Sequence, residues 1–263
     1  MGKIFDTLRS LKLAVSPRTY STIANWPTYF ADRLSLIRSE YTVILTNGLK
    51  ITLVGNTETR WPLEEIILRD DYEIKGLQPE PPRTILDLGA QIGIFSLYAK
   101  ILFPQVKVYA YEPYPRYVRL LKKNIVRNHF QDSIFPFPLA CYSEDVVRRK
   151  KQGKPLTGEK APEWFYPFNA AVSFAEILAA NRLRAVDLVK MDVEGAEYDI
   201  LYSLKINDLE RIHRLCLEYH DIDTTNDLNG ASLQWFLEKN RFTVKCKKSR
   251  LSHIGILIAT NRR

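Results

Sequence analysis

Cysteine is scarce in this chain. Three cysteines occur among 263 residues, and no two of them are spaced as C-x-x-C. The small number argues against a disulfide framework, and the spacing argues against a zinc site. Cys141, Cys216 and Cys246 all lie in apolar, strand-like stretches, so we expect three buried thiols in a reducing compartment.

Long hydrophobic runs are missing as well. No stretch approaches the roughly 20 apolar residues of a membrane-spanning helix, and the first residues lack the uninterrupted apolar core of a signal peptide. Gly2 is compatible with N-myristoylation, but Asp6 stands where that motif needs Ser or Thr. These absences predict a cytoplasmic protein.

Negative charge is in the minority. The 38 lysines and arginines exceed the 30 aspartates and glutamates, which gives a formal charge of +8. This excess favours an anionic partner, such as nucleic acid, anionic lipid or a phosphorylated glycan carrier. Residues 4–11 form a short basic amphipathic segment that is suited to peripheral contact with a membrane, although packing against its own domain is the commoner fate of such a segment.

The third glycine of a dinucleotide-binding turn is also absent. Residues 83–100 read as a strand, a tight turn and a helix, with Asp87, Gly89 and Gly93 at the turn. A pyrophosphate site needs G-x-G-x-x-G, so this turn suits a nucleoside ligand without phosphate, such as S-adenosylmethionine (SAM). A valine side chain at Gly89 is expected to block binding of that ligand by crowding the turn. Glycine also ends strands for purely conformational reasons, so the turn needs support from the rest of the chain.

A second strand ends in a carboxylate. Residues 106–111 are strand formers that stop at Glu112 and Pro113. In a strand-helix-strand unit, an acidic side chain at this position meets the ribose hydroxyls of a ligand that lies across the first turn. The alternative for Glu112 is an ordinary solvated glutamate before a proline, and the glycine turn favours the binding role.

A third strand ends in a cluster of carboxylates. Residues 186–191 are followed by Asp192, Glu194 and Glu197, and Gly195 permits a sharp exit into the next helix. A surface helix also tolerates such a cluster. Because Asp192 follows an apolar strand directly, we expect this strand end to face the ligand crevice.

These three segments together resemble the FkbM family of SAM-dependent methyltransferases. Residues 87–93 (DLGAQIG) are similar to the family's first motif, and residues 190–197 (KMDVEGAE) are similar to its K-x-D-x-E-G-x-E hallmark. Residues 121–128 look like its asparagine-bearing helix, with Asn124 and Asn128, and residues 172–178 look like the segment that leads into the hallmark. The likeness covers roughly residues 41 to 263, and Gln91 replaces the asparagine of the first motif.

The resemblance implies an α/β fold of the Rossmann-like class I methyltransferase type. It has a doubly wound seven-stranded, mostly parallel sheet with one antiparallel strand, here preceded by N-terminal helices and a β-hairpin. It implies SAM as the cofactor and a hydroxyl as the methyl acceptor, on a saccharide or an anionic small molecule. The predicted cofactor-binding residues are Asp87, Gly89, Ala90, Gln91, Gly93, Glu112, Pro113, Asp192 and, at the amino acid end of SAM, Tyr72.

Methylation of a hydroxyl calls for a base within hydrogen-bond reach. His220 is the first candidate because the ordinary pKa of histidine lies near neutrality, although a lone histidine after a strand is more often structural. Asp192 and Glu194 are the alternatives, either as the base or as balance for the positive sulfonium. Glu218 also lies at a strand end, and nothing in the spacing demands a metal.

We expect two regions in the chain. Residues 1–76 are predicted to form a helical and β-hairpin extension that packs on the SAM-binding domain of residues 77–263. Residues 143–170 are expected to form an irregular basic and aromatic loop, either a substrate lid or a solvated insertion.

The other expected elements are helices at 27–39, 62–74 and 233–239, a hairpin at 41–53, an irregular strand at 133–142, and strands at 215–219, 242–247 and 254–259.

Three other functions compete with this prediction. An RNA methyltransferase suits the positive charge, and the lack of an N-P-P-aromatic strand end argues against amino-group chemistry but not against a ribose hydroxyl. A binding or scaffold protein that has lost turnover would keep the fold, but Asp87, Gly89 and Asp192 are all in place. A nicotinamide-dependent enzyme comes last because of the glycine spacing.

Overall fold

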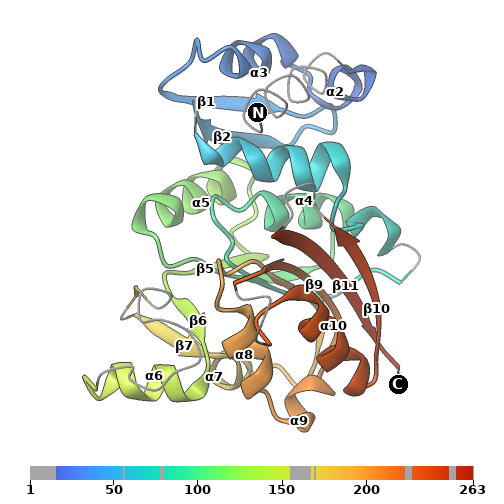
Figure 1. Ribbon diagram of the computed structural model, residues 1–263. Helices are drawn as coiled ribbons and strands as arrows, with labels where there is room; N and C mark the ends of the chain where they lie inside the picture. Colours follow the sequence, from blue (N-terminus) through green and yellow to red (C-terminus); the bar gives the residue numbers. More distant parts are fainter. Residues whose placement is uncertain are drawn as a thin grey trace.

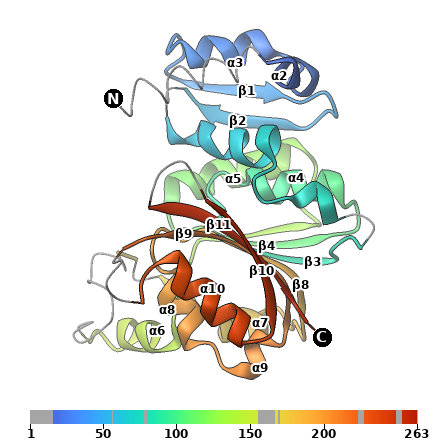
Figure 2. The ribbon, with the colours of Figure 1, turned by 45° about the vertical axis from the view of Figure 1, so that its right-hand side comes forward.

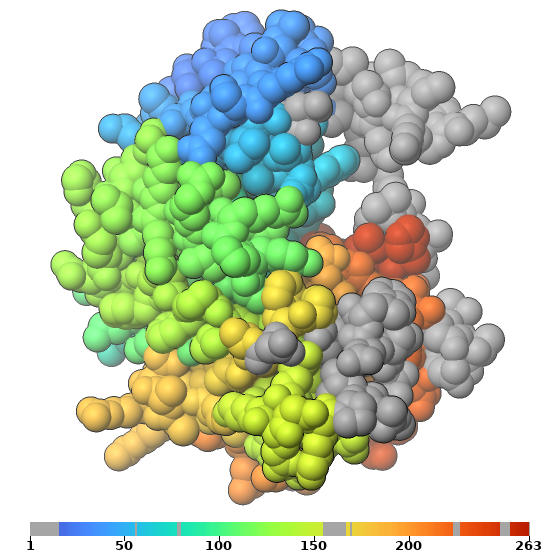
Figure 3. All heavy atoms as spheres, turned by 90° about the vertical axis from the view of Figure 1, so that its left-hand side faces the viewer, coloured from blue at the N-terminus to red at the C-terminus, as the bar shows by residue number. Residues whose placement is uncertain are grey.

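The computed structural model describes residues 16–55, 57–77, 80–154, 167–168, 170–222, 227–248 and 253–262. A central twisted sheet carries helices on both faces. The N-terminal elements form a further layer beyond the helices of one face (Figures 1 and 2). In the space-filling view of one side, the blue N-terminal residues continue without a break into the green middle of the chain (Figure 3).

The strands of the central sheet follow the order β10-β11-β9-β8-β3-β4-β5. Neighbouring strands are parallel except in the two pairs that contain β11. This confirms the predicted fold class, a doubly wound seven-stranded sheet with one antiparallel strand. The strands are β3 (Thr84–Leu88), β4 (Lys107–Tyr111), β5 (Ile134–Phe137), β8 (Val186–Met191), β9 (Ile212–His220), β10 (Phe242–Lys248) and β11 (Ile254–Asn261).

The strand order reverses beside β3. Strands β4 and β5 follow β3 on one side, whereas β8 and β9 lie on the other. The connections on the two sides lead away from each other, so a crevice opens at the carboxyl ends of the strands at this point. The fold therefore brings the ends of β3, β4 and β8 to one place.

The sheet separates two hydrophobic clusters. Successive residues of a strand point to opposite faces, and accordingly Ile85 belongs to one cluster and Leu86 to the other. The helices are α4 (Ile94–Leu102), α5 (Pro115–Arg127), α6 (Glu144–Lys151), α7 (Phe174–Ala180), α8 (Glu197–Ser203), α9 (Ile206–Leu209) and α10 (Gly230–Lys239). Helices α4 and α5 cover the face nearer the N-terminal layer, and α7, α8 and α10 cover the other face (Figure 2).

The N-terminal layer contains α2 (Pro17–Thr22), α3 (Trp26–Arg33) and the hairpin of β1 (Glu40–Ile44) and β2 (Lys50–Val54). The predicted hairpin is confirmed, with Gly48 in the left-handed region at φ 88°. The helix expected at 27–39 is shorter, because the chain turns at Ser35, whose φ is 58°. The short helix expected at 4–11, and with it the predicted membrane contact, lies outside the described residues.

Asn124 of α5 and Asn128, the residue that caps the end of this helix, hold the hairpin against α5. The Asn124 side chain accepts from the Thr52 N–H at 2.7 Å and donates to the Thr52 carbonyl at 3.2 Å and to the Ile92 carbonyl at 3.0 Å. One turn later, the Asn128 side chain accepts from the Lys50 N–H at 2.9 Å and donates to the Lys50 carbonyl at 2.7 Å. The amides thus imitate a neighbouring strand along the free edge of β2.

The chain between the hairpin and the sheet differs from the single helix expected at 62–74. It forms the 3₁₀ turn η1 (Glu58–Arg60), the π-helix η2 (Leu63–Arg69) and the 3₁₀ turn η3 (Ile74–Leu77). The π-helix ends at Asp70, which takes a left-handed conformation with φ 56°. Leu63, Ile66 and Tyr72 from this segment share a hydrophobic cluster with Ile85 of the central sheet.

The strand expected at 133–142 is two strands in different sheets. Strand β5 ends at Phe137 at the edge of the central sheet, and Pro138, which has no N–H to donate, follows where the chain leaves it. Strand β6 (Ala140–Tyr142) then pairs in parallel with β7 (Ala171–Ser173). The expectation of an edge position is confirmed for β5 only.

The region expected to be an irregular loop at 143–170 begins with helix α6. The Ser143 hydroxyl accepts from the Val146 N–H at the start of this helix, and the acidic residues Glu144 and Asp145 occupy its first turn. The basic residues 148–151 therefore lie on a helix and not on a loop. Residues 155–166 and 169 lie outside the described part of the chain.

Two of the three thiols are buried as expected. Cys141 and Cys216 are inside, whereas Cys246 is exposed because β10 is an edge strand. Within the described ranges, no helix combines the length and the apolar character needed to cross a membrane. The division of the chain at residue 76 stays a prediction.

Candidate cofactor and active site

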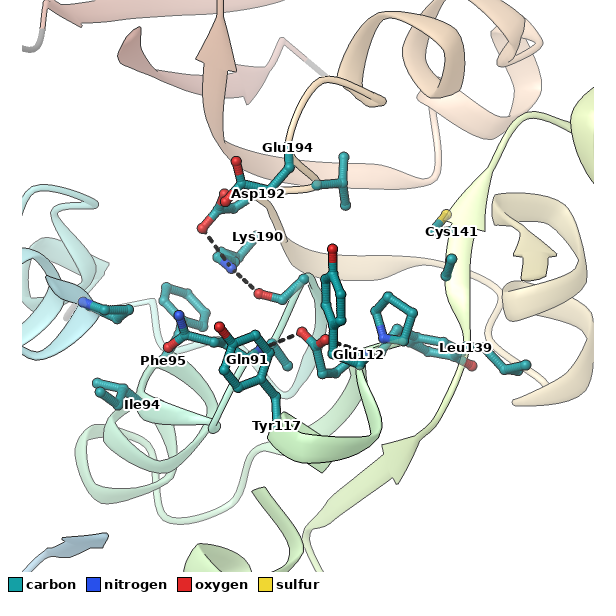
Figure 4. A pocket seen from close by; sticks show the side chains of 18 of the residues that line it. Gln91, Ile94, Phe95, Glu112, Tyr117, Leu139, Cys141, Lys190, Asp192 and Glu194 are labelled. Carbon is teal, nitrogen blue, oxygen red and sulfur yellow. Dashed lines mark hydrogen bonds and ion pairs between the residues drawn. The ribbon is translucent and has the colours of Figure 1, made fainter. Parts of the chain in front are cut away.

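A cavity of about 400 Å³ lies at the carboxyl ends of β3, β4 and β8, within the size range of small-molecule sites. Its walls come from the first turn, from the segment after β4, from β6 and from the hallmark after β8 (Figure 4). The N-terminal segment closes it with residues of η1 and η2. The lining residues used below are Glu65, Tyr72, Gly89, Ala90, Gln91, Tyr111, Glu112, Pro113, Leu139, Cys141, Lys190, Asp192 and Glu194.

The first turn packs tightly on the end of β8. The N–H groups of Gly89 and Ala90 both donate to the Tyr111 carbonyl at 3.0 Å, and Gly89 has a φ of 77°. A Cβ at Gly89 would collide with the backbone carbonyl of Asp192. A side chain here would therefore crowd the turn as expected, by meeting the protein's own backbone at the end of β8. Its effect on cofactor binding stays a prediction.

Lys190 joins the first turn to the hallmark. Its Nζ donates to the Gly89 carbonyl at 2.6 Å and lies 3.5 Å from Asp87 Oδ1 and 3.4 Å from Asp192 Oδ2. Burial alone would lower the pKa of this lysine, but Asp192 and Asp87 raise it above its usual value. The lysine is therefore a fixed positive charge beneath the cavity. Reasoning from the sequence did not place it in the site, although a lysine inside an apolar strand was a signal.

Glu112 lies at the tip of β4, and both of its carboxylate oxygens accept hydrogen bonds from backbone N–H groups. One oxygen accepts from the Gln91 N–H and the other from the Tyr114 N–H, each at 2.8 Å (Figure 4). Burial raises the pKa of Glu112 to about 7, and these two hydrogen bonds limit the rise. Each carboxylate oxygen has a second lone pair, so Glu112 can still accept from a ligand hydroxyl.

The side chain of Gln91 carries a hydrogen-bond acceptor that no donor satisfies. Gln91 takes a left-handed conformation at φ 49°, and its side-chain Oε1 is buried with no hydrogen-bond partner among the described residues. A buried polar atom of this kind is costly unless a ligand or water satisfies it. The longer amide that replaces the family's asparagine therefore offers an acceptor to an N–H or O–H group in the cavity.

The part of the cavity beside Glu112 is apolar and flat. Pro113, Leu139 and Cys141 line it, and Tyr111 stacks on Phe137 behind it at a centroid distance of 4.7 Å. Such a slot accepts a planar ring and excludes water. Together with the carboxylate of Glu112, it has the shape and the polarity that an adenosine requires.

The other end of the cavity is acidic. Asp192 and Glu194 project from the loop after β8 (Figure 4), and Glu65 comes from η2. Tyr72 is buried beside them, in edge-to-face contact with Phe95 at 5.8 Å. Burial and the charge of Asp192 raise the pKa of Tyr72 well above its usual value, so the phenol stays neutral.

His220 lies at the end of β9, beside this acidic end and not on the cavity wall. Its Nδ1 is 3.1 Å from Glu197 Oε1, and its Nε2 is 3.5 Å from Glu194 Oε2 and 3.7 Å from Glu218 Oε1. Burial alone would lower the pKa of His220, but the bond to Glu197 and the surrounding carboxylates raise it to about 10. The ring is therefore an imidazolium at neutral pH and has no lone pair with which to accept a proton.

The structure brings most of the predicted residues to one place. Gly89, Ala90, Gln91, Glu112, Pro113, Asp192, Glu194 and Tyr72 line the cavity. Asp87 lies behind the turn, where it accepts from the Ser96 hydroxyl at 2.6 Å, and Gly93 begins α4 in a left-handed conformation. Glu65 was not predicted, although Tyr72 from the same part of the chain was, because the sequence pattern does not show which other residues before the first motif turn toward the cavity.

Comparison with known proteins agrees with this geometry. The family model described as the methyltransferase FkbM domain matches residues 87–243. The 31-O-demethyl-FK506 methyltransferase FkbM of Streptomyces tacrolimicus is 25% identical in an alignment 220 residues long that covers 69% of this chain and 82% of that protein. The AMB antimetabolite synthetase AmbE of Pseudomonas aeruginosa is 25% identical in an alignment 249 residues long that covers 80% of this chain but only 12% of that much longer protein.

A solved structure, the SAM-dependent methyltransferase from Agrobacterium tumefaciens, superposes with a TM-score of 0.49 and 12% identity over 86% of this chain and 71% of that one. The family model spans more than half of the chain, from the first motif to β10. It includes the turn, Glu112 and the whole hallmark. The chain therefore belongs to the FkbM family of SAM-dependent methyltransferases.

Proposed function

We propose that this protein is an O-methyltransferase whose acceptor is a hydroxyl, on a sugar of a glycan or glycolipid precursor or on a related small molecule. One observation carries the proposal: a single cavity joins Glu112, an apolar slot and the hallmark Asp192. The name of the Streptomyces relative specifies a 31-O-demethyl substrate, which supports methylation at oxygen.

The residues of the cavity fit SAM in a defined direction. Glu112 would hold the ribose hydroxyls, and the slot of Pro113, Leu139 and Cys141 would hold the adenine. The methionine end would then lie toward Asp192, Glu65 and Tyr72. The unpartnered Oε1 of Gln91 offers an acceptor to a donor group of the cofactor, which supports occupancy of the cavity by a nucleoside.

SAM supplies an activated methyl group on a positively charged sulfur. The protein's part is to align the acceptor hydroxyl, exclude water and hold the proton that the hydroxyl loses. Asp192 is suited to the last task, because it lines the cavity with 27% of its side chain exposed and pairs with Lys190 at 3.4 Å. The buried Lys190 ammonium fixes the position of this carboxylate at the cavity.

His220, the first candidate for the base, takes a different part in this proposal. As an imidazolium it pairs with Glu194, Glu197 and Glu218. It would act as a positioning residue that holds the end of β9 and the hallmark loop together. Glu194 lines the cavity too, but 83% of its side chain is exposed, so water competes with any acceptor there.

The charge of the site refines the predicted acceptor. The whole chain is positive, which favours an anionic partner, but the end of the cavity beside Asp192 is lined by carboxylates. A neutral hydroxyl fits that end better than an anion does. The proposed acceptor is therefore a neutral sugar hydroxyl, and a ribose hydroxyl of RNA is the alternative outcome of the test.

The test is incubation with methyl-labelled SAM and a deproteinised cell extract, followed by fractionation. We expect label in the saccharide or glycolipid fraction, and no label with the Asp192→Asn variant. Label that nuclease releases would assign the protein to RNA instead. Calorimetry that shows no SAM binding, together with no incorporation, would identify a non-catalytic member of the family.

A further inference from the structure

At the acidic end of the cavity, the carboxyl groups outnumber the cations that pair with them. Arg69 pairs with Glu65 at 3.2 Å and with Asp71 at 2.7 Å. Lys190 pairs with two more carboxyl groups, and His220 pairs with three, at the distances given above. Within the described ranges, three cations thus connect seven carboxyl groups. The carboxyl groups are Glu65, Asp71, Asp87, Asp192, Glu194, Glu197 and Glu218.

Two of these carboxyl groups are poorly compensated. Burial, followed by the charge of Asp192, raises the pKa of Glu218 to about 9. For Glu65 burial is again the main cause, opposed by Arg69, and its pKa rises to about 7. A cation that enters the cavity beside Glu65 would favour the charged form of this carboxyl group.

Glu65 is the member of the cluster best placed to meet such a cation. It lines the cavity, whereas Glu218 does not, and its side chain is only 30% exposed, against 83% for Glu194. Arg69, the cation that pairs with Glu65, is shared with Asp71, just as Lys190 is shared by Asp192 and Asp87. Negative charge at Glu65 is thus both shielded from water and incompletely balanced.

Glu65 also comes from an unusual element. It lies in the π-helix η2 (Leu63–Arg69), and the N–H groups of Asp70 and Asp71 both donate to its carbonyl at the end of that helix. π-Helical turns are rare and occur frequently at functional sites. Residues 63–69 precede the part of the chain that matches the family model, which begins at residue 87.

We infer that Glu65 makes this protein prefer SAM over its demethylated product, S-adenosylhomocysteine, by interacting with the positive charge of the sulfonium. The inference rests on the proposed placement of SAM in the cavity. The two molecules share the adenosine, the ammonium and the carboxylate, and they differ in the methyl group and in the charge on sulfur. The preference would also favour release of the product after transfer.

The test is the ratio of the two dissociation constants, measured by titration calorimetry with SAM and with S-adenosylhomocysteine. We expect the wild-type protein to bind SAM more tightly, and Glu65→Gln to reduce that preference by about tenfold, the effect of one partly buried charge. An unchanged ratio would overturn the inference. Equal weakening of both ligands would also overturn it, because it would assign Glu65 to the shared ammonium.

Two matched variants separate this inference from the placement of the cofactor. Glu112→Gln should weaken both ligands equally, because the ribose is common to them; if it changes neither affinity, the placement itself is wrong. Glu73→Gln removes a carboxylate of the same segment that pairs with Lys245 and Lys247 outside the cavity, and it should change neither affinity.

A measurement without substitution covers the case in which Glu65→Gln does not fold. The preference of the wild-type protein for SAM should increase between about pH 6 and about pH 8, as Glu65 loses its proton. Glu65→Asp, which keeps the charge, should keep most of the preference. A preference of the wild-type protein that is constant over this pH range would assign no role to the charge.

Discussion

At the scale of single residues, Lys190 explains why the first motif and the hallmark occur together in one chain. Its ammonium donates to the Gly89 carbonyl and pairs with Asp87 and Asp192. Replacing both carboxylates by neutral groups would leave this buried cation without an anionic partner. The pairing therefore links the geometry of the cofactor turn to the charge of the proposed base.

Asp192→Asn should lower kcat by about 10²-fold or more, because the amide cannot accept a proton from the acceptor hydroxyl. The melting temperature should change little, since Lys190 keeps Asp87 and the Gly89 carbonyl as partners. The measurement is methyl incorporation into the acceptor fraction identified by labelling, together with a thermal melt.

The control is Asp187→Asn at the opposite end of the same strand. There the carboxylate accepts from the N–H groups of Arg83 and Thr84, far from the cavity. This variant should retain turnover. Full turnover in Asp192→Asn would remove Asp192 from the proposed mechanism.

The pH dependence of stability should report the imidazolium of His220. Its pKa is about 10 in the folded protein, above the ordinary value of 6.5. The folded state thus binds the proton more tightly, and the stabilisation is complete below about pH 6.5 and is lost as the pH rises toward 10. Urea unfolding at about pH 7 and about pH 10 should show a larger loss of unfolding free energy for the wild type than for His220→Gln. Equal losses would mean that the ring is neutral.

At the scale of elements, the residues at the ends of the strands provide the chemical groups of the site. The carboxyl ends of β3, β4 and β8 each deliver one part of the site, and their meeting follows from the parallel order of these strands. The tight approach of the first turn to the end of β8 is the feature that holds the two motifs in register. Glycine at position 89 is required by that approach.

Gly89→Ala should destabilise the fold by about 4 kcal/mol or more, because the new methyl group meets the backbone carbonyl of Asp192, which cannot swing away. Gly48→Ala is the matched control. Gly48 has a similar φ of 88° but no atom within 4 Å of the added Cβ, so only the backbone cost of about 1 kcal/mol should appear. Equal losses in chemical denaturation of the two variants would show that the backbone conformation alone determines the cost.

The π-helix and the start of α6 are two elements that the sequence pattern did not predict. Both stretches have helical periodicity in part, but neither the i→i+5 hydrogen bonding of residues 63–69 nor the cap at Ser143 could be assigned from spacing. Periodicity predicts the face that is buried and not the pitch of the helix. Glu65 reaches the cavity through that pitch.

At the scale of the whole molecule, the N-terminal layer and the sheet share one hydrophobic cluster. Leu63, Ile66 and Tyr72 pack with Ile85 and Phe95, and Asn124 and Asn128 bind the edge of β2. The segment between the hairpin and the sheet also closes the acidic end of the cavity. The site is therefore complete only when this segment packs on the sheet.

A fragment of residues 77–263 should therefore not melt cooperatively, because it exposes the apolar residues that the extension covers. Circular dichroism during heating, compared with the full chain, makes the measurement. A fragment that melts in one sharp transition and binds SAM would establish residues 77–263 as an independent domain.

The sequence alone was sufficient for the parts of the protein that are encoded locally. The strand-turn-helix of residues 83–100, Glu112 and the hallmark are short patterns, and each requires its residue types at fixed spacing. Tertiary structure decided the rest. It placed Lys190 beneath the turn, Glu65 over the cavity and His220 among carboxylates that keep it protonated, because charge balance and burial depend on neighbours that lie far apart along the chain.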